Sequence, residues 1–216
     1  MSYFKRIILS QSKPKKSLLW LVIMFLVVVF LITYLDNIRY NWYMIELIEC
    51  VPNFSEGRDK NKINDIINSI KTNANITVLD VDMGFDTNRT VVTIVGSPNE
   101  IVKAAFYGIK RASEIIDMKK HLGTHPRLGS TDVCPLIPIS NVTDEDCIKL
   151  SLKLSKRVGQ ELGIPVYLYE KSSIRPYRKK LPDIRKGEYE GLNKKLKNKK
   201  WAPDFGPSKM NENAGA

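Results

Sequence analysis

The chain has 216 residues and a net charge of +11, with 34 basic and 23 acidic side chains. This length suits one fair-sized domain with additions. The three cysteines, Cys50, Cys134 and Cys147, are odd in number and irregularly spaced, which excludes a disulfide framework, and no CxxC pair for zinc is present. We therefore expect buried thiols in a reduced protein.

The first apolar stretch runs from Ser17 to Leu35 and contains no charged residue. A helix of this length spans roughly 28 Å, which predicts a single membrane-spanning helix within an N-terminal extension of residues 1–43. Five basic residues precede the stretch, whereas only Arg39, beside Asp36, follows closely. The positive-inside rule then places the N-terminus in the cytoplasm, and the lack of a small-residue cleavage site favours an uncleaved anchor over a signal peptide.

A second interpretation of the N-terminus is a start of translation at Met44, which opens the segment MIELIECVPNFSEG. Residues 1–43 would then be an upstream extension that is not translated, and the protein would be cytoplasmic. The sequence leaves both interpretations open. It also leaves the side of the membrane open, because the charge bias points the domain outward while unpaired thiols suit the cytoplasm.

From Met44 onward, hydrophobic periodicity predicts alternating strands and helices in one domain, residues 44–216. Ser55 is a candidate cap for the first helix, and Thr143 with Asp146 resembles a capping box. The predicted strands are 45–51, 76–81, 89–95, 131–139 and 165–169, and the predicted helices are 58–71, 99–118 and 143–162. This order predicts an α+β fold, a ferredoxin-like sandwich with helices on one face of a mixed or antiparallel sheet. The strand at 131–139 contains prolines and therefore belongs at an edge.

Both histidines of the protein lie in one short segment, His121 to Gly129. Two histidines four residues apart would suggest a metal site on a helix, but Gly123 lies between them and Pro126 follows, so we predict a loop and no metal. An imidazole next to Arg127 suits proton transfer on an anionic substrate. The alternative is a surface loop with two incidental histidines.

A strongly basic segment extends from Lys171 to Lys200, with twelve basic and three acidic residues, a net charge of +9. Such runs are usually solvated surfaces. The segment could also attract a polyanionic ligand. No recognised nucleic-acid motif accompanies it, so we expect no nucleic-acid partner.

Six blocks of the sequence, taken in order, resemble one known family, the N-terminal subdomain of glutamate formiminotransferase. This subdomain is also part of the transferase half of formiminotransferase-cyclodeaminase. The blocks are ECVPNFSEG (49–57), LDVDMGFDTNRTVVTIVG (79–96), IDMKKHLGTHPRLGSTDVCPLIPI (116–139), IPVYLYE (164–170), LPDIRKGEYEGL (181–192) and WAPDFGP (201–207). The resemblance extends from about Met44 to Ala216, and nothing before Met44 belongs to the pattern.

The resemblance implies a reaction in histidine degradation and one-carbon metabolism. The formimino group of N-formimino-L-glutamate passes to N5 of tetrahydrofolate, which acts as a co-substrate. The family's catalytic histidine matches His125, and its Asp in the DVDxG block matches Asp82, which would orient the imidazole. The chemistry agrees, because N5 must lose a proton as it attacks, and a group that titrates near neutrality can accept it. A turn residue that satisfies backbone amides is the alternative for Asp82.

The resemblance also implies residues that bind the substrate and folate. The family's folate-binding tail matches Gly206 to Gly215, but after Ser208 the sequence departs from the pattern. The residues implied in binding are Arg127, Asn88, Arg89, Gly206, Pro207 and Ser208.

In the family a second subdomain follows and supplies the other half of the binding walls. The resemblance therefore implies a partner, either a separate C-terminal subdomain or a homo-oligomer. Two further functions stay open: a non-catalytic folate-binding or interaction module tethered to a membrane, and a basic domain for nucleic acid or anionic lipid. A folate substrate would again suit the cytoplasm.

Overall fold

The structure is a computed structural model that describes residues 15–43 and 45–216. These residues form two compact units, one up to Ile45 and one from Glu46 to Ala216. Residues 1–14 and the predicted start of the domain at Met44 lie outside the described residues.

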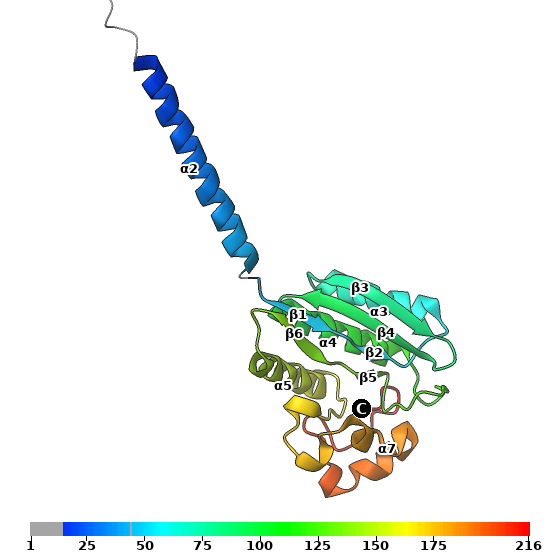
Figure 1. The fold of residues 1–216 in the computed structure, drawn as a ribbon. Helices are drawn as coiled ribbons and strands as arrows, with labels where there is room; N and C mark the ends of the chain where they lie inside the picture. The colour runs from blue at the N-terminus through cyan, green and yellow to red at the C-terminus, as the bar shows by residue number, and fades with distance from the viewer. Residues whose placement is uncertain (1–14, 44) are drawn as a thin grey trace, which may run out of the picture. The chain divides into compact units, whose positions relative to one another are not determined.

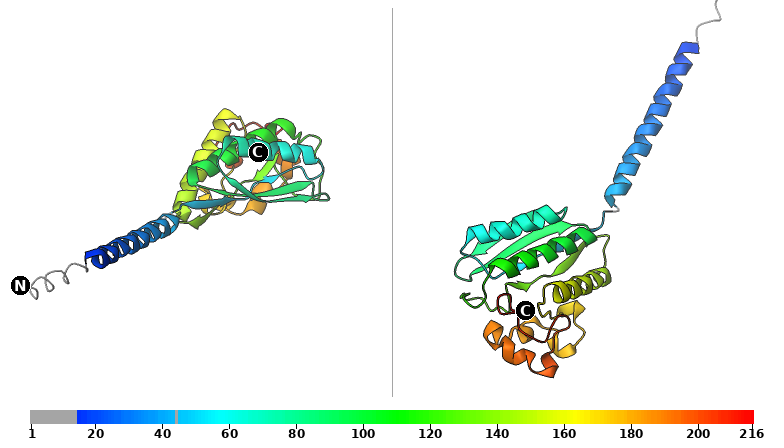
Figure 2. Two further views of the ribbon diagram at one scale, coloured as in Figure 1. Left: turned by 90° about the horizontal axis from the view of Figure 1, so that it is seen from above. Right: turned by 180° about the vertical axis from the view of Figure 1, so that it is seen from behind.

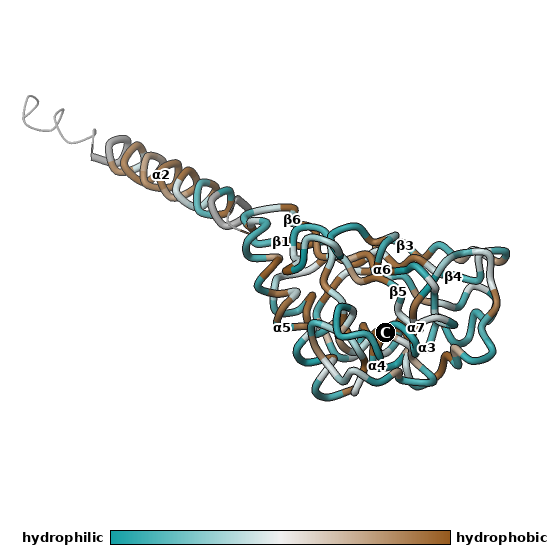
Figure 3. The backbone as a smooth tube through the Cα atoms, turned by 90° about the horizontal axis from the view of Figure 1, so that it is seen from below, coloured by the Kyte–Doolittle hydropathy of each residue, from teal (hydrophilic) through white to brown (hydrophobic). Residues whose placement is uncertain are grey.

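Helix α2 (Lys15–Tyr43) forms the N-terminal unit and is 29 residues long. Its stretch from Leu19 to Arg39 is long and apolar enough to cross a membrane, at about 1.5 Å per residue. Figure 3 shows apolar residues along most of this helix. The predicted helix at 17–35 is confirmed. Membrane crossing stays a prediction, because only length and composition support it and a signal sequence meets the same criterion.

Six strands form one sheet in the second unit. They are β1 (Leu47–Cys50), β2 (Asn53–Phe54), β3 (Thr77–Gly84), β4 (Arg89–Gly96), β5 (Thr131–Val133) and β6 (Leu136–Ser140). Strand β4 pairs with β3 on one side and with both β1 and β2 on the other, while β6 pairs with β1 and β5 pairs with β2. Pro52 and Pro135 lie at the breaks between β1 and β2 and between β5 and β6, since proline offers no N–H to a ladder.

Counting each interrupted pair as one strand gives the order of a ferredoxin-like βαββαβ fold. The predicted topology is therefore confirmed, and the proline-bearing strand lies at an edge as expected. Of the two predicted alternatives the antiparallel sheet is confirmed and the mixed sheet is wrong, because every pair among the described strands is antiparallel. The reason is that strands joined by a helix are not neighbours: β4 lies between β2 and β3, and β1 and β2 separate β4 from β6 and β5.

Helices α3 (Lys60–Asn73) and α4 (Pro98–Ile115) cover one face of the sheet (Figures 1 and 2). The predicted isoleucine stripe of α3 is buried there, against Val92 and Ile94 of β4. Alternate residues of β4, such as Val91 and Thr93, are only half-buried because they point to the other, uncovered face. Helix α5 (Asp144–Glu161) packs beside α4 and β6.

Side-chain caps fix the starts of helices α3 and α5. Thr143 and Asp146 form the predicted capping box of α5. The prediction that Ser55 caps α3 is wrong: Asp59 accepts from the backbone N–H groups of Asn61 and Lys62, and Ser55 donates to the Gly129 carbonyl instead. Asp59 lies one residue before the helix, within reach of its first free N–H groups.

After α5 the chain forms short helices in place of the last predicted strand. Val166 makes a single bridge to Phe205, so the strand predicted at 165–169 is wrong. Leu128 and three residues of the short helices, Ile184, Leu192 and Leu196, form a second buried cluster. The helices are α6 (Leu181–Arg185) and α7 (Glu188–Leu196), with 3-10 turns at Glu170–Ser172, Pro176–Arg178 and Lys199–Trp201.

Some basic residues of the segment 171–200 form ion pairs within the protein. Arg178 is fully buried and pairs with Asp204, and Lys171 lies 2.5 Å from Asp144. These pairs reduce the charge that the segment presents to a ligand. Attraction of a polyanion stays a prediction.

The three thiols are free. Cys50 and Cys147 are buried, as predicted, and Cys134 is half-buried. The Sγ atoms of Cys50 and Cys134 lie 3.5 Å apart, and this contact, together with burial, raises the pKa of Cys50 well above its ordinary value. Cys50 is therefore a protonated thiol at neutral pH.

Candidate active site

The histidine segment is a loop between α4 and β5, as predicted. It packs against the turn that joins β3 to β4. Asn88 in that turn donates to the Leu122 carbonyl at 2.9 Å, and the Thr124 N–H donates to Asp86 at 3.3 Å. Gly123 is required here because a Cβ atom would lie 2.3 Å from the Thr87 carbonyl oxygen.

His121 has a structural place in the loop. It is 8% exposed, and its Nδ1 accepts from Nε of Arg127 at 3.2 Å. An arginine can only donate, so Nδ1 carries no proton, and Nε2 donates to the Asn88 carbonyl at 2.8 Å. Burial lowers the pKa of His121, and the imidazole is therefore neutral and fixed in the Nε2–H tautomer.

Arg127 is buried and fully engaged. Its guanidinium donates to His121 Nδ1 and to the His121 carbonyl, and also to Glu188 at 2.8 Å and to Glu190 at 2.7 and 3.0 Å. These contacts use the five donors that an arginine has. The predicted substrate-binding role of Arg127 would require one of these partners to be displaced.

His125 lies in a different environment, with a side chain that is 20% exposed. Its Nε2 lies 3.2 Å from Nη1 of Arg89 on β4 and 3.8 Å from Oδ2 of Asp132 on β5. The side chain of Asp132 is 1% exposed, accepts from the Leu128 N–H at 3.0 Å and pairs with Arg185 of α6. The loop, the central strand, the edge strand and a short helix thus meet at one imidazole.

The electrostatics of this cluster favour the neutral imidazole. Burial lowers the pKa of His125 first, followed by the positive charges of Arg89 and Arg185, while Asp132 and Glu188 act in the opposite direction. Because the guanidinium of Arg89 can only donate, Nε2 of His125 is the acceptor in their hydrogen bond. His125 therefore holds an unprotonated Nε2 at neutral pH, the state that a general base requires.

The predicted site residues are only partly brought together. Asp82 is exposed on β3 and pairs with Val91, which places it on the uncovered face of the sheet together with Arg89. Among the described residues Asp82 makes no hydrogen bond or ion pair with His125. Asn88 is buried, and its amide joins Gly57 to Leu122.

The predicted folate-binding residues Gly206, Pro207 and Ser208 lie elsewhere. Gly206 adopts a positive φ of 81° and packs against Gly159 of α5. The part of the tail that touches the histidine loop comes later: the Ser130 N–H donates to Ala214 at 2.8 Å. Within the described residues, no contact joins Gly206, Pro207 or Ser208 to His125.

Sequence reasoning missed Asp132 and Arg185. Both lie within blocks that carry the family resemblance, 116–139 and 181–192. The available signal was a lone carboxylate in a short edge strand, Thr131 to Val133, seven residues after His125. Asp132 and Arg185 are 53 residues apart in the sequence, so no local pattern indicated the ion pair between them.

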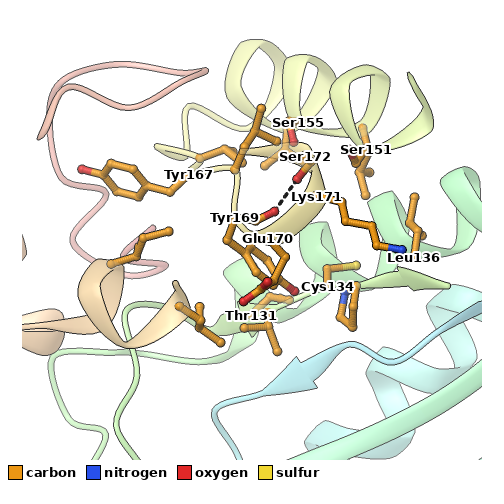
Figure 4. Close-up of a pocket in the computed structure, with 18 of the residues that line it drawn as sticks. Thr131, Cys134, Leu136, Ser151, Ser155, Tyr167, Tyr169, Glu170, Lys171 and Ser172 are labelled. Carbon is orange, nitrogen blue, oxygen red and sulfur yellow. Dashed lines mark hydrogen bonds between the residues drawn. The ribbon is translucent and has the colours of Figure 1, made fainter. Parts of the chain in front are cut away.

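A pocket of about 470 Å³ adjoins this cluster and shares Asp132 with it. Figure 4 shows side chains from β5 and β6, from α5 and from residues 164–172 around it. Its walls are largely apolar, with Thr131, Tyr169 and Lys171 among the polar groups. Burial raises the pKa of Tyr169 well above its ordinary value, so its phenol is neutral. The pocket can hold an apolar group next to the buried carboxylate.

Comparison with known proteins gives three close relatives. Formimidoyltransferase-cyclodeaminase of Dictyostelium discoideum is 53% identical over 173 residues, which are 80% of this chain and 32% of that protein. Glutamate formimidoyltransferase of Thermoplasma acidophilum is 49% identical over 174 residues, 80% of this chain and 57% of that protein. The protein of the same name in Streptococcus pyogenes serotype M1 is 45% identical over 172 residues, 80% of this chain and 58% of that protein.

The chain thus spans less than two thirds of the length of each of these relatives. A family model described as the formiminotransferase domain, N-terminal subdomain, matches residues 47–216. These matches confirm the resemblance seen in the six sequence blocks. Since the matched region is most of the chain, the chain belongs to the formiminotransferase family and carries its N-terminal subdomain.

Proposed function

We propose that the protein takes part in the transfer of a formimino group from N-formimino-L-glutamate to N5 of tetrahydrofolate, a step of histidine degradation. Membership of the family and the names of the relatives support this proposal. The observation that carries it is the unprotonated Nε2 of His125, between a guanidinium and a buried carboxylate. An incidental surface histidine would not have this environment.

In the proposed reaction His125 is the general base. As N5 of tetrahydrofolate attacks the formimino carbon, its proton passes to Nε2 of His125. The bond from that carbon to the nitrogen of glutamate then breaks, and protonated His125 returns the proton to the leaving amine. The lowered pKa of His125 keeps the base form populated at neutral pH. Asp82, on the same sheet face as Arg89, would orient the imidazole or relay the proton.

Arg89 is the best-placed cation for a substrate carboxylate. Its Nε is buried and has no hydrogen-bond partner in the described structure, whereas Arg127 uses all its donors internally. A carboxylate that met Arg89 would satisfy this N–H, and a bidentate pair would fix its orientation. Asn88 would then support the site indirectly, through the backbone it holds.

The proposed site needs further walls. The relatives are longer than the chain, and we infer that a second subdomain, in further residues, in a separate chain or in a second copy, completes it. The uncovered sheet face presents Ile137 and Ile139, which are 38% and 54% exposed. Apolar residues gathered on one face suit a protein partner.

We also propose that residues 1–43 anchor the domain of residues 44–216 to a membrane through α2, if they are translated. The length and composition of Leu19–Arg39 support this. Translation from Met44 would instead give a cytoplasmic protein.

The function is tested by measuring formimino transfer with the purified full chain in detergent. The assay is run with the chain alone and with the addition of the part of the Thermoplasma acidophilum relative that this chain does not match. We expect His125→Ala to lose about 10² to 10⁴ in rate, with folate binding little changed. Lys153→Ala, an exposed change on α5, is the matched control and should keep full activity.

Two results would contradict the proposal. Normal turnover in a folded His125→Ala variant would remove the histidine from the reaction. Folate binding without any transfer, even with the second subdomain present, would support a non-catalytic folate-binding or interaction module instead.

A further inference from the structure

Nε2 of His125 faces two groups of opposite charge. Arg89 Nη1 lies at 3.2 Å, within hydrogen-bond range, and Asp132 Oδ2 lies at 3.8 Å, which is too long for a hydrogen bond. A ring nitrogen with a lone pair can accept from Arg89 but has nothing to offer Asp132. The distances therefore match the neutral ring.

Protonation of Nε2 reverses these preferences. The new N–H cannot bond to Arg89, which has no acceptor, and the positive ring is repelled by the guanidinium. Asp132 can accept the N–H after a small rotation of the imidazole, since the gap to be closed is about 1 Å relative to a good hydrogen bond. Both partners of the ring are thus present in the same structure.

Asp132 is held in place for this task. It is 1% exposed, and the Leu128 N–H and Arg185 bind it. The ion pair with Arg185 weakens the attraction of Asp132 for the ring. Without that compensation, a buried carboxylate would stabilise a permanent imidazolium and remove the base.

We propose that Arg89 and Asp132 form a two-position switch for His125, in which the neutral ring accepts from Arg89 and the protonated ring donates to Asp132. Asp132 is then a positioning residue: it takes no proton itself and stabilises the imidazolium that proton transfer creates. This reading of the catalytic step rests on the proposed function, whereas the switch itself does not need a substrate.

Within the described residues, the charged groups that act most on His125 come from four elements. Arg89 comes from β4, Asp132 from β5, Arg185 from α6 and Glu188 from α7. Glu188 is tied to Arg127 at 2.8 Å, so it adds a weaker and more distant negative charge. Changes at Arg89, Arg185 and Asp132 should therefore dominate the titration of the ring.

The test is NMR titration of the full chain in detergent micelles with ¹⁵N-labelled histidine. The protein has two histidines, and His125→Gln assigns the signals. We expect opposite tautomers at pH 7.5, Nδ1–H for His125 and Nε2–H for His121. Asp132→Asn should lower the pKa of His125 by about one unit, and Arg89→Gln should raise it.

One control variant and one further variant separate the switch from general charge effects. Asp183→Asn removes an exposed carboxylate of α6 and should leave the titration of His125 unchanged. Arg185→Gln frees Asp132 from its ion pair and should raise the pKa of His125. If the enzyme is active, the acidic limb of its pH–rate profile should move in the same direction in each variant.

An unchanged titration of His125 in a folded Asp132→Asn variant would overturn the switch. Should that variant fail to fold, Arg89→Gln decides the question, and an unaltered pKa and tautomer there would overturn it equally. Since no substrate is present, an inactive chain still gives a result, so this failure is distinct from failure of the proposed function.

Discussion

The two histidines of the loop, four residues apart in the sequence, have different chemistry because they meet different neighbours. His121 has both ring nitrogens occupied, by Arg127 and by the Asn88 carbonyl. His125 has one nitrogen between Arg89 and Asp132 and a partly exposed ring. One histidine therefore holds the loop, and the other is available for proton transfer.

Replacing His121 should affect stability more than replacing His125. His121→Ala leaves the buried Nε of Arg127 and the carbonyl of Asn88 without partners, which costs about 1 to 3 kcal/mol of unfolding free energy for each unsatisfied group. Urea unfolding of the full chain in detergent measures this. His125→Ala is the control, and an equal loss in both variants would contradict the assignment of His121 to the loop structure.

The lowered pKa values of both histidines predict that the folded protein loses stability in mild acid. Their folded pKa values lie below the ordinary value of 6.5, so the unfolded chain binds more protons as the pH falls below that value. Stability is complete above pH 6.5 and is lost as the pH falls through the lowered pKa values.

The measurement is the urea midpoint between pH 7.5 and 5.5, above the range where Glu190, whose pKa is lowered by Arg127, begins to contribute. We expect the midpoint to fall with pH in the native chain. The slope should be reduced in His121→Gln. A flat profile for the native chain would contradict the proposed neutral state of the two rings.

At the scale of elements, the C-terminal segment holds the histidine loop against the sheet. The Ser130 N–H donates to Ala214, and the Ala216 N–H donates to Leu128 at 3.3 Å. The two backbones approach so closely that a Cβ atom on Gly129 would lie 2.3 Å from the Ala216 carbonyl oxygen. Only glycine fits there, because backbone on both sides leaves nothing that can move aside.

Gly129→Ala should therefore destabilise the second unit by about 1 to 3 kcal/mol, the usual cost of overpacking. Gly191→Ala is the matched control, because Gly191 lies in helix α7 with open space around its Cα. Alanine is the better helix former, so this variant should gain up to about 1 kcal/mol. Urea unfolding compares the two, and equal stabilities would show that the tail does not pack on the loop as described.

At the scale of the whole molecule, the apolar side chains of helix α2 and those of the domain are buried differently. Helix α2 has no buried contact for its apolar side chains among the described residues between Leu19 and Arg39. The domain has its own core between the sheet and α3, α4 and α5. The domain should therefore keep its fold without the helix, and the helix should decide where the protein is located.

Carbonate extraction of cells that express the full chain checks the proposed anchor. We expect the full chain to pellet with membranes and a chain that starts at Met44 to stay in the supernatant. Replacing Leu26 and Val27 by lysine in the full chain is a sharper variant, since charge at the centre of a span is costly. Equal solubility of all three forms would rule out the anchor.

The sequence by itself determined the ferredoxin-like order, the isoleucine face of α3, the capping box of α5 and the loop character of the histidine segment. These features depend on local periodicity, on capping and on proline and glycine, which act over a few residues. The blocks of family resemblance likewise pointed to the family and to His125.

Only the tertiary structure decided which groups meet at His125. Arg89, Asp132 and Arg185 come from β4, β5 and α6, and no local pattern links a residue to a partner tens of positions away. The same reason explains why Arg127, which lies within the histidine loop, is predicted at the substrate but is bound by Glu188 and Glu190. Proximity in sequence sets a backbone position, while long-range packing decides what the side chain touches.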